Sequence, residues 1–155
     1  MSSAASDRSD LFLGISSLLT GFSRVQLVGT GMADEYLRTL EAVLDEDVLN
    51  DLLGAYARLP AGDEREAAVA SEILGKQKLG PVAWNLILLW YCGTWTALPE
   101  DWRESFGRSP LDTDRVISAD AYVAGLQWVA AGAHPAGARQ QGFGAWALPP
   151  PEAAR

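Results

Sequence analysis

The hydrophobic pattern of the chain is densest over residues 82–92, where Asn85 is the only strongly polar side chain. At 100° per residue, this run carries apolar residues all round a helix, which is typical of a helix that buries one face in its own domain and another in a partner. Pro81 suits a first helical position, because its missing N–H is unpaired there anyway, and Gly93 ends the run. One side carries Val82, Leu86, Leu89 and Trp90, and the other carries Trp84, Ile87, Leu88 and Tyr91.

A buried strand over residues 86–92 is the rival interpretation, because short apolar runs do not separate a strand from a buried helix. We favour the helix. The run is far shorter than the roughly 20 apolar residues that cross a bilayer, so it predicts no membrane span.

Apolar residues also recur at helical spacing in four stretches before this run and in one after it. Capping residues and glycine stops set their expected limits. The first expected helix runs from a cap at Ser9 or Asp10 to about Thr20, with Gly21 as the stop, and the second begins at Thr30 or Asp34 and carries an apolar stripe to Leu44. The third begins at the acidic residues 45–47 with a stripe to Tyr56, and the fourth runs from a capping-box-like start at Asp63 to near Gly75. The last begins at a Ser118 cap and runs from Ala119 to about Ala131.

The remaining segments lack a helical period. Residues 23–31 are expected to form a connection, and residues 93–115 an ordered loop with short turns. The pattern therefore predicts an all-α fold: one small domain over residues 1–155, with about five to six helices and long aromatic-rich loops. Residues 1–8 are expected to be disordered, and residues 132–155 to form an extended Gly/Pro-rich tail that wraps the domain or a partner.

The net charge and the single cysteine argue against several classes of binding site. A formal net charge of −8 argues against nucleic-acid binding, because a basic patch supplies most of that affinity. Cys92 alone cannot form an internal disulfide or hold a metal, and within the apolar run it is expected to be a small buried hydrophobe. The N-terminal stretch MSSAASDRSD has neither an apolar core nor twin arginines, so no export signal is expected.

The sequence offers little that points to chemistry. The only histidine, His134, has no patterned orienting partner or nucleophile, as a general base would need, and is expected to fix the turn between the last helix and the tail. Gly29-Thr30-Gly31 lacks the preceding strand of a phosphate loop and is expected to be a turn. The carboxylates at 45–47 could hold a metal, but helix capping is favoured. No catalytic residue, cofactor-binding residue or metal ligand is therefore expected.

The six tryptophans all lie in the second half of the chain, several in expected loops. Trp and Tyr are enriched at the centres of protein interfaces, so a partner surface is one explanation, and clamping of irregular loops onto the helices is the other. On the last helix, Tyr122, Leu126 and Val129 are expected to face inward, which places Trp128 on the opposite side. We predict that Trp128 and the tail form one partner-binding surface. The expected partner-interface residues are Trp84, Trp95, Trp102, Trp128, His134, Phe143 and Trp146.

Four segments together resemble a known family: FLGISSLLTGF (12–22), GTGMADEYLRTL (29–40), LGKQKLGPVAWNLILLWYCGTW (74–95) and VISADAYVAGLQWVAAGAHPAGARQQGFGAWALPP (116–150). They are similar to the small subunit of membrane-associated, FAD-containing sugar and polyol dehydrogenases, the D-sorbitol dehydrogenase small-subunit family, which has relatives in fructose and glucose dehydrogenase complexes. The resemblance covers nearly the whole chain. Its most specific blocks are LWYxGTW at residues 89–95 and GAHPxGAxQ with the following Gly-aromatic-Gly-x-Trp at residues 132–146.

The resemblance implies a non-catalytic accessory subunit that carries no cofactor. In such complexes a large subunit holds FAD and oxidises the sugar, a cytochrome c subunit often passes electrons to quinone, and the helical small subunit supports maturation and export of the large one. Small subunits of this family often carry a twin-arginine signal, which this chain lacks. We therefore expect periplasmic localisation by co-export with the partner, or else a cytoplasmic copy. The alternatives from other classes are a free-standing sugar-binding module and an enzyme that uses His134.

Overall fold

The central apolar run forms helix α6 (Gly80–Cys92), as the sequence pattern predicts, and the strand interpretation is wrong. Pro81 lies in its first turn. Gly93 ends the helix in a left-handed conformation with φ +66°, and its N–H donates to the Leu89 carbonyl at 2.9 Å. Glycine suits this position because it lacks the Cβ atom that makes positive φ costly for other residues.

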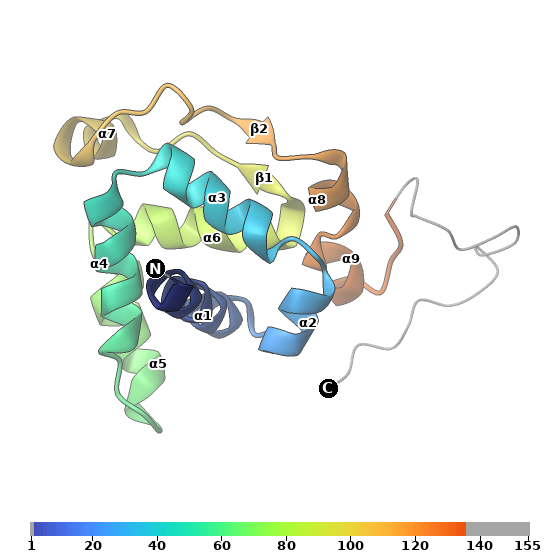
Figure 1. Cartoon of the computed structure of the whole chain (residues 1–155), viewed down its shortest axis with the longest axis horizontal. Helices are drawn as coiled ribbons and strands as arrows, with labels where there is room; N and C mark the ends of the chain where they lie inside the picture. The colour runs from blue at the N-terminus through green and yellow to red at the C-terminus, as the bar shows by residue number, and fades with distance from the viewer. Residues whose placement is uncertain (1, 136–155) are drawn as a thin grey trace, which may run out of the picture.

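A computed structural model describes the backbone of residues 2–135 and the side chains of residues 7–135 (Figure 1). The all-α class is confirmed, with more helices than the five or six expected and one small two-stranded sheet. In chain order the elements are α1 (Ser2–Thr20), α2 (Arg24–Gly29), α3 (Ala33–Val43), α4 (Glu46–Ala57), α5 (Glu64–Val69), a π-helical segment η1 (Ala70–Leu74), α6, β1 (Thr94–Trp95), α7 (Glu100–Phe106), β2 (Arg115–Val116), α8 (Ala119–Val123) and α9 (Leu126–Ala130).

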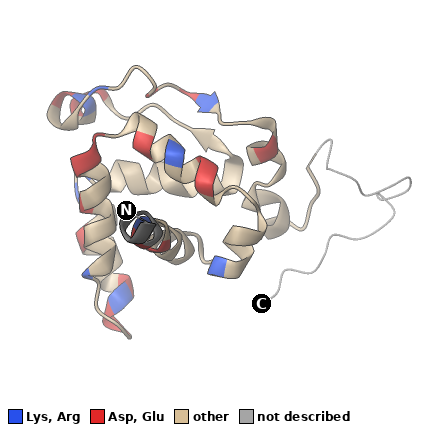
Figure 2. Ribbon diagram, in the orientation of Figure 1, with Lys and Arg blue, Asp and Glu red and all other residues tan. Residues whose placement is uncertain are grey.

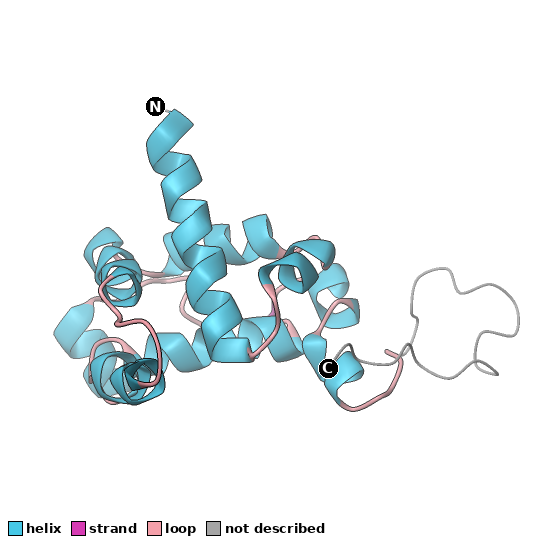
Figure 3. Cartoon of the chain, turned by 90° about the horizontal axis from the view of Figure 1, so that it is seen from below, coloured by secondary structure: helices cyan, strands magenta, loops and turns pink. Residues whose placement is uncertain are grey.

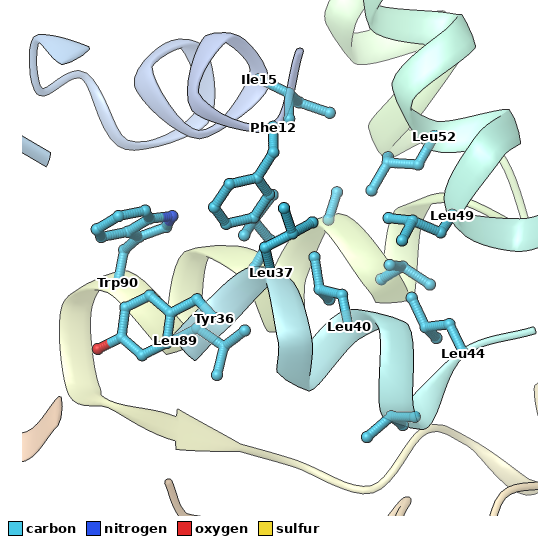
Figure 4. Close-up of a cluster of buried hydrophobic side chains, with 14 of the residues drawn as sticks. Phe12, Ile15, Tyr36, Leu37, Leu40, Leu44, Leu49, Leu52, Leu89 and Trp90 are labelled. Atoms are coloured by element: carbon cyan, nitrogen blue, oxygen red, sulfur yellow. The ribbon is translucent and has the colours of Figure 1, made fainter. Parts of the chain in front are cut away.

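The core lies where α1, α3 and α4 pack together with the inner side of α6. In Figure 1, α4 and α5 lie at one end of α6, and α8 and α9 at the other. Figure 4 shows Phe12, Tyr36 and Trp90 grouped in this core: the rings of Phe12 and Trp90 stack with centroids 6.1 Å apart, and Tyr36 meets Trp90 edge-on at 4.9 Å. The stripe expected on α3 is fully buried, which confirms its helical period; its members are Tyr36, Leu37, Leu40, Val43 and Leu44.

The hydroxyl of Tyr36 is buried in this core and has no hydrogen-bond partner among the described residues. Burial raises the pKa of the Tyr36 phenol well above its ordinary value, with smaller contributions from Glu35 and Cys92. A buried polar group without a partner loses its hydration and gains nothing in return.

Replacing Tyr36 with phenylalanine is therefore expected to raise the free energy of unfolding by about 1 kcal/mol. Because the folded pKa is raised, the unfolded chain ionises first as pH rises above about 10, and Tyr36 contributes a loss of stability there that the variant lacks. Urea unfolding at pH 7 and at alkaline pH measures both effects. The matched control is Tyr91→Phe, which should lose about 1 kcal/mol, because the Tyr91 hydroxyl donates to the Thr20 carbonyl at 2.8 Å. A destabilised Tyr36→Phe variant would contradict the prediction.

Helix α1 begins earlier than the sequence predicts. The structure places residues 2–8, which were expected to be disordered, in the first turns of α1, and its N-terminal end projects beyond the other helices (Figure 3). Arg8 explains part of the extension, because its guanidinium donates to Asn50 at 2.8 Å and to Glu41 at 3.2 Å. The end of α1 at Thr20 is as expected, with Gly21 at φ +79°.

Residues 23–31 were expected to form a connection, but they contain helix α2. Ser23 caps this helix: its side chain accepts from the Gln26 N–H, and the Gln26 side chain accepts from the Ser23 N–H at 2.9 Å. This capping box, Ser-x-x-Gln, is a signal of a helix start that the sequence contains. By contrast, Asp63 makes no side-chain cap at the start of α5, although the sequence suggested one there.

Segment 93–115 is ordered, as expected, but it includes β1, β2 and helix α7. Two polar side chains fix it. The Asn85 amide donates to the Thr96 carbonyl and accepts from the Thr96 N–H, both at 2.9 Å. The buried Asp112 carboxylate accepts from the Trp95 indole N–H at 2.7 Å, from the Leu98 N–H at 3.0 Å and from Arg103 Nε at 3.3 Å. The loop is therefore held by hydrogen bonds to α6 and to itself.

The expected last helix is divided into α8 and α9 by a break at residues 124–125. At Gly125 a Cβ atom would lie 2.7 Å from the Tyr91 carbonyl oxygen, so the chain passes so close to α6 that only glycine fits without a shift. The predicted inward face of one continuous helix is accordingly wrong: Leu126 is buried, Tyr122 is half-buried, and Val129 is exposed. Ser118 does cap α8, accepting from the Ala121 N–H at 3.0 Å.

Candidate partner-binding surface

The outer face of α6, formed by Trp84, Ile87, Leu88 and Tyr91, is the candidate functional surface. The opposite side of the helix is buried almost completely: Val82, Leu86 and Leu89 have no exposed area, and Trp90 is 1% exposed. On the outer face, Trp84 is 59% exposed, and the other three residues are half-buried. The two apolar sides predicted from the sequence are thus one core side and one side that the described residues leave partly uncovered.

The two ends of this outer face differ. At the C-terminal end Tyr91 is held, since its hydroxyl is bonded to the Thr20 carbonyl and its ring meets Phe22 edge-on at 6.0 Å. Toward the N-terminal end Trp84 is the most exposed aromatic side chain in the described part of the chain. Positions 84, 87, 88 and 91 have the i, i+3, i+4, i+7 spacing by which a helix fills a hydrophobic groove.

Charge is nearly absent from α6 and from the segment of α8 and α9 that packs against it. Residues 79–99 contain no Asp, Glu, Lys or Arg, and residues 116–135 contain only Asp120. Figure 2 shows coloured charged residues on α2, α3, α4, α5, α7, α8 and β2, while α6 is uncoloured. Depletion of charge together with an exposed aromatic residue is the composition of an interface core.

Two of the predicted interface residues belong to the core instead. Trp95 is 1% exposed, and Trp102 is 3% exposed. The Trp95 indole is bonded to Asp112, and the Trp102 indole N–H donates to the Lys78 carbonyl at 2.9 Å. Both indoles clamp segment 93–115 onto the domain, which is the alternative explanation that the sequence left open.

Trp128 lies in a different environment from the one predicted. Its ring meets Tyr122 edge-on at 5.4 Å, and its indole N–H donates to the Tyr122 carbonyl at 2.8 Å, so the two residues are neighbours and not on opposite sides of a helix. His134 is half-buried, and its Nε2 has no hydrogen-bond partner within the described residues. Phe143 and Trp146 lie outside the described residues, so the predicted surface that joins them to Trp128 stays a prediction.

The charged surface of the described residues includes two open grooves. One, of about 530 Å³, lies between α1, α3 and α4 and includes Arg8. The other, of about 550 Å³, lies between the end of α4 and residues 72–79 and includes Lys78. Three of the five cations that line them are paired with carboxylates: Arg8 with Glu41 and Glu46, Lys76 with Glu72, and Lys78 with Asp51 at 2.6 Å. Such paired surface charges contribute little binding energy to a ligand.

The described residues contain no group of three or more His, Cys, Asp or Glu side chains placed to hold a metal ion. Asp45 stands at the N-cap of α4 without a side-chain cap hydrogen bond, so the favoured capping role of the acidic residues 45–47 is limited to Glu46 and Asp47 in the first turn. Cys92 is half-buried, less covered than expected. No helix in the described range is long and apolar enough to cross a membrane.

No family model, curated protein or solved structure matches this chain.

Proposed function

We propose that this chain is a non-catalytic accessory subunit of an FAD-dependent sugar or polyol dehydrogenase, and that the outer face of α6 docks on the flavoprotein large subunit. The observation that carries the proposal is the uncharged apolar outer face of α6, on which Trp84 is the most exposed side chain. The resemblance of residues 89–95 and 132–146 to the dehydrogenase small subunits supplies the identity of the partner.

In this proposal FAD and the oxidation of the sugar belong to the large subunit, a cytochrome c subunit accepts the electrons in complexes that have one, and this chain stabilises the large subunit and travels with it to the periplasm. A free-standing sugar-binding module and an enzyme using His134 remain as alternative functions. The experiment that separates the three is purification of the tagged chain from its native cell: a stoichiometric flavoprotein partner supports the accessory subunit. Sugar binding or turnover by the pure chain without any partner supports one of the others.

Trp84→Ala is expected to weaken binding to the large subunit by roughly 2 kcal/mol, about 30-fold in Kd, as loss of a buried aromatic anchor does. Circular dichroism of the isolated chain should be almost unchanged, because Trp84 is 59% exposed. The affinity is measured by titrating each variant into purified large subunit.

The matched control is Leu111→Ala. Leu111 is exposed to a similar degree, at 50%, but it lies in the charged segment between α7 and β2. It should change the affinity less than threefold, since surface apolar residues away from an interface contribute little. Equal losses for the two variants, or none for Trp84→Ala, would exclude the outer face of α6 as the docking surface.

A further inference from the structure

The C-terminal end of the outer face of α6, at Tyr91, lies near helix α9, after which the chain leaves the described structure. Helix α9 packs against α6, and Gly125, just before α9, approaches the Tyr91 backbone closely. Trp84 is seven residues from Tyr91, which is about 10 Å along an α-helix. The chain then continues through Pro135 into residues 136–155.

These last residues have the composition that would suit the outer face. Residues 140–151, QQGFGAWALPPP, contain no charged side chain, and they include Phe143, Trp146 and Leu148. Their lack of charge matches residues 79–99, which contain none either. An uncharged aromatic segment can cover an uncharged apolar helix face without burying an unpaired charge.

The connecting chain is long enough. The path from Tyr91 through α9 to Pro135 could place Pro135 at most about 35 Å from Trp84, because the helix rises 1.5 Å per residue and an extended chain about 3.3 Å. Trp146 follows Pro135 by eleven residues, which span about 36 Å when extended. Because the segment belongs to the same chain, its docking on α6 is intramolecular and does not depend on protein concentration.

We infer that in the isolated chain the aromatic residues Phe143 and Trp146 dock on the outer face of α6, next to Trp84. The segment then covers the surface that the large subunit takes in the complex, and binding of the large subunit displaces it. The displacement rests on the proposed function, whereas the docking itself does not. A covered outer face would keep the free subunit from associating through Trp84 before it meets its partner.

A mutant cycle on the isolated full chain tests the docking. The paired substitution Phe143→Ala/Trp146→Ala is made in the original chain, in Trp84→Ala and in Val25→Ala, and the Tm of each protein is measured. Val25 is 82% exposed and lies on α2, not on α6. Docking predicts that the paired substitution lowers the Tm by about 3 °C in the original chain and in Val25→Ala, and by less than about 1 °C in Trp84→Ala.

An equal Tm shift in all three backgrounds, or no shift in any, would overturn the inference, since Trp84 and the terminal aromatics would then be independent. Trp84→Gln serves as a second variant with the same expectation should Trp84→Ala fold poorly.

Sedimentation velocity at several concentrations tests a further expectation, that the chain remains monomeric. A dimer that Phe143→Ala/Trp146→Ala dissociates would place the segment on a second copy and reject docking within one chain. The cycle uses no large subunit, so its failure leaves the co-purification test of the proposed function unaffected.

Discussion

Replacing Gly93 with alanine is expected to lower the free energy of unfolding by about 2–4 kcal/mol, measured by urea denaturation followed by circular dichroism. Two costs add. Gly93 has φ +66°, where a Cβ atom costs about 1 kcal/mol. That atom would also lie 2.5 Å from the Ala121 carbonyl carbon and 2.6 Å from its oxygen. These are backbone atoms that cannot rotate away, so α8 must shift from α6, and overpacking of this kind costs about 1–3 kcal/mol.

Gly62→Ala is the control that separates the two costs. Gly62 also has positive φ, +81°, but a Cβ atom there would meet nothing within 4 Å. Its loss should therefore be about 1 kcal/mol, the conformational cost alone. If Gly93→Ala lost no more than Gly62→Ala, the close approach of α8 to the end of α6 would not hold in solution.

Asp112→Ala is expected to cost about 3 kcal/mol, because it leaves the buried Trp95 indole N–H and the Leu98 N–H without an acceptor and removes the ion partner of Arg103. The side chain of Asp112 is 2% exposed, so water does not readily replace it. Loss of the link should also loosen segment 93–115, which hydrogen exchange of its amides would detect as faster exchange.

Asp114→Ala is the matched control, two residues along the same loop. Asp114 accepts from the Ala97 N–H at 2.7 Å, but it is exposed, and water can take its place. Its loss should be about 0.5–1 kcal/mol. A comparable loss of unfolding free energy for the two variants would show that the contribution of Asp112 to stability does not depend on its burial.

The helices that carry a long apolar period were predictable from the sequence, because the period shows which residues share one side of a helix. For α6 it assigned Val82, Leu86, Leu89 and Trp90 to one side, and the structure buries all four. The same holds for the stripe of α3. The short helix α2 was not predicted, because six residues are too few to show a helical repeat of apolar positions. The capping box formed by Ser23 and Gln26 was a local signal of its start.

The environments of the tryptophans were less predictable, because they depend on partners far away in the sequence. The Trp95 indole N–H donates to Asp112, seventeen residues later, and the Trp102 indole N–H donates to the Lys78 carbonyl, twenty-four residues earlier. Nothing in the local pattern of residues 93–115 specifies these contacts. The break in the last helix has the same origin: Ala124-Gly125 would tolerate a helix locally, and the approach to Tyr91 turns the chain instead.

The single polar residue inside α6 has a consequence for how the molecule behaves at high concentration. Exposed edges of β-sheets recruit strands from other chains, and proteins avoid such aggregation by covering or interrupting them. Next to β1, the Asn85 amide occupies both the N–H and the carbonyl of Thr96, the groups that a third strand would use there. Asn85 thereby acts as a cap on the sheet: a side chain of the central helix stands where an intermolecular strand would otherwise pair.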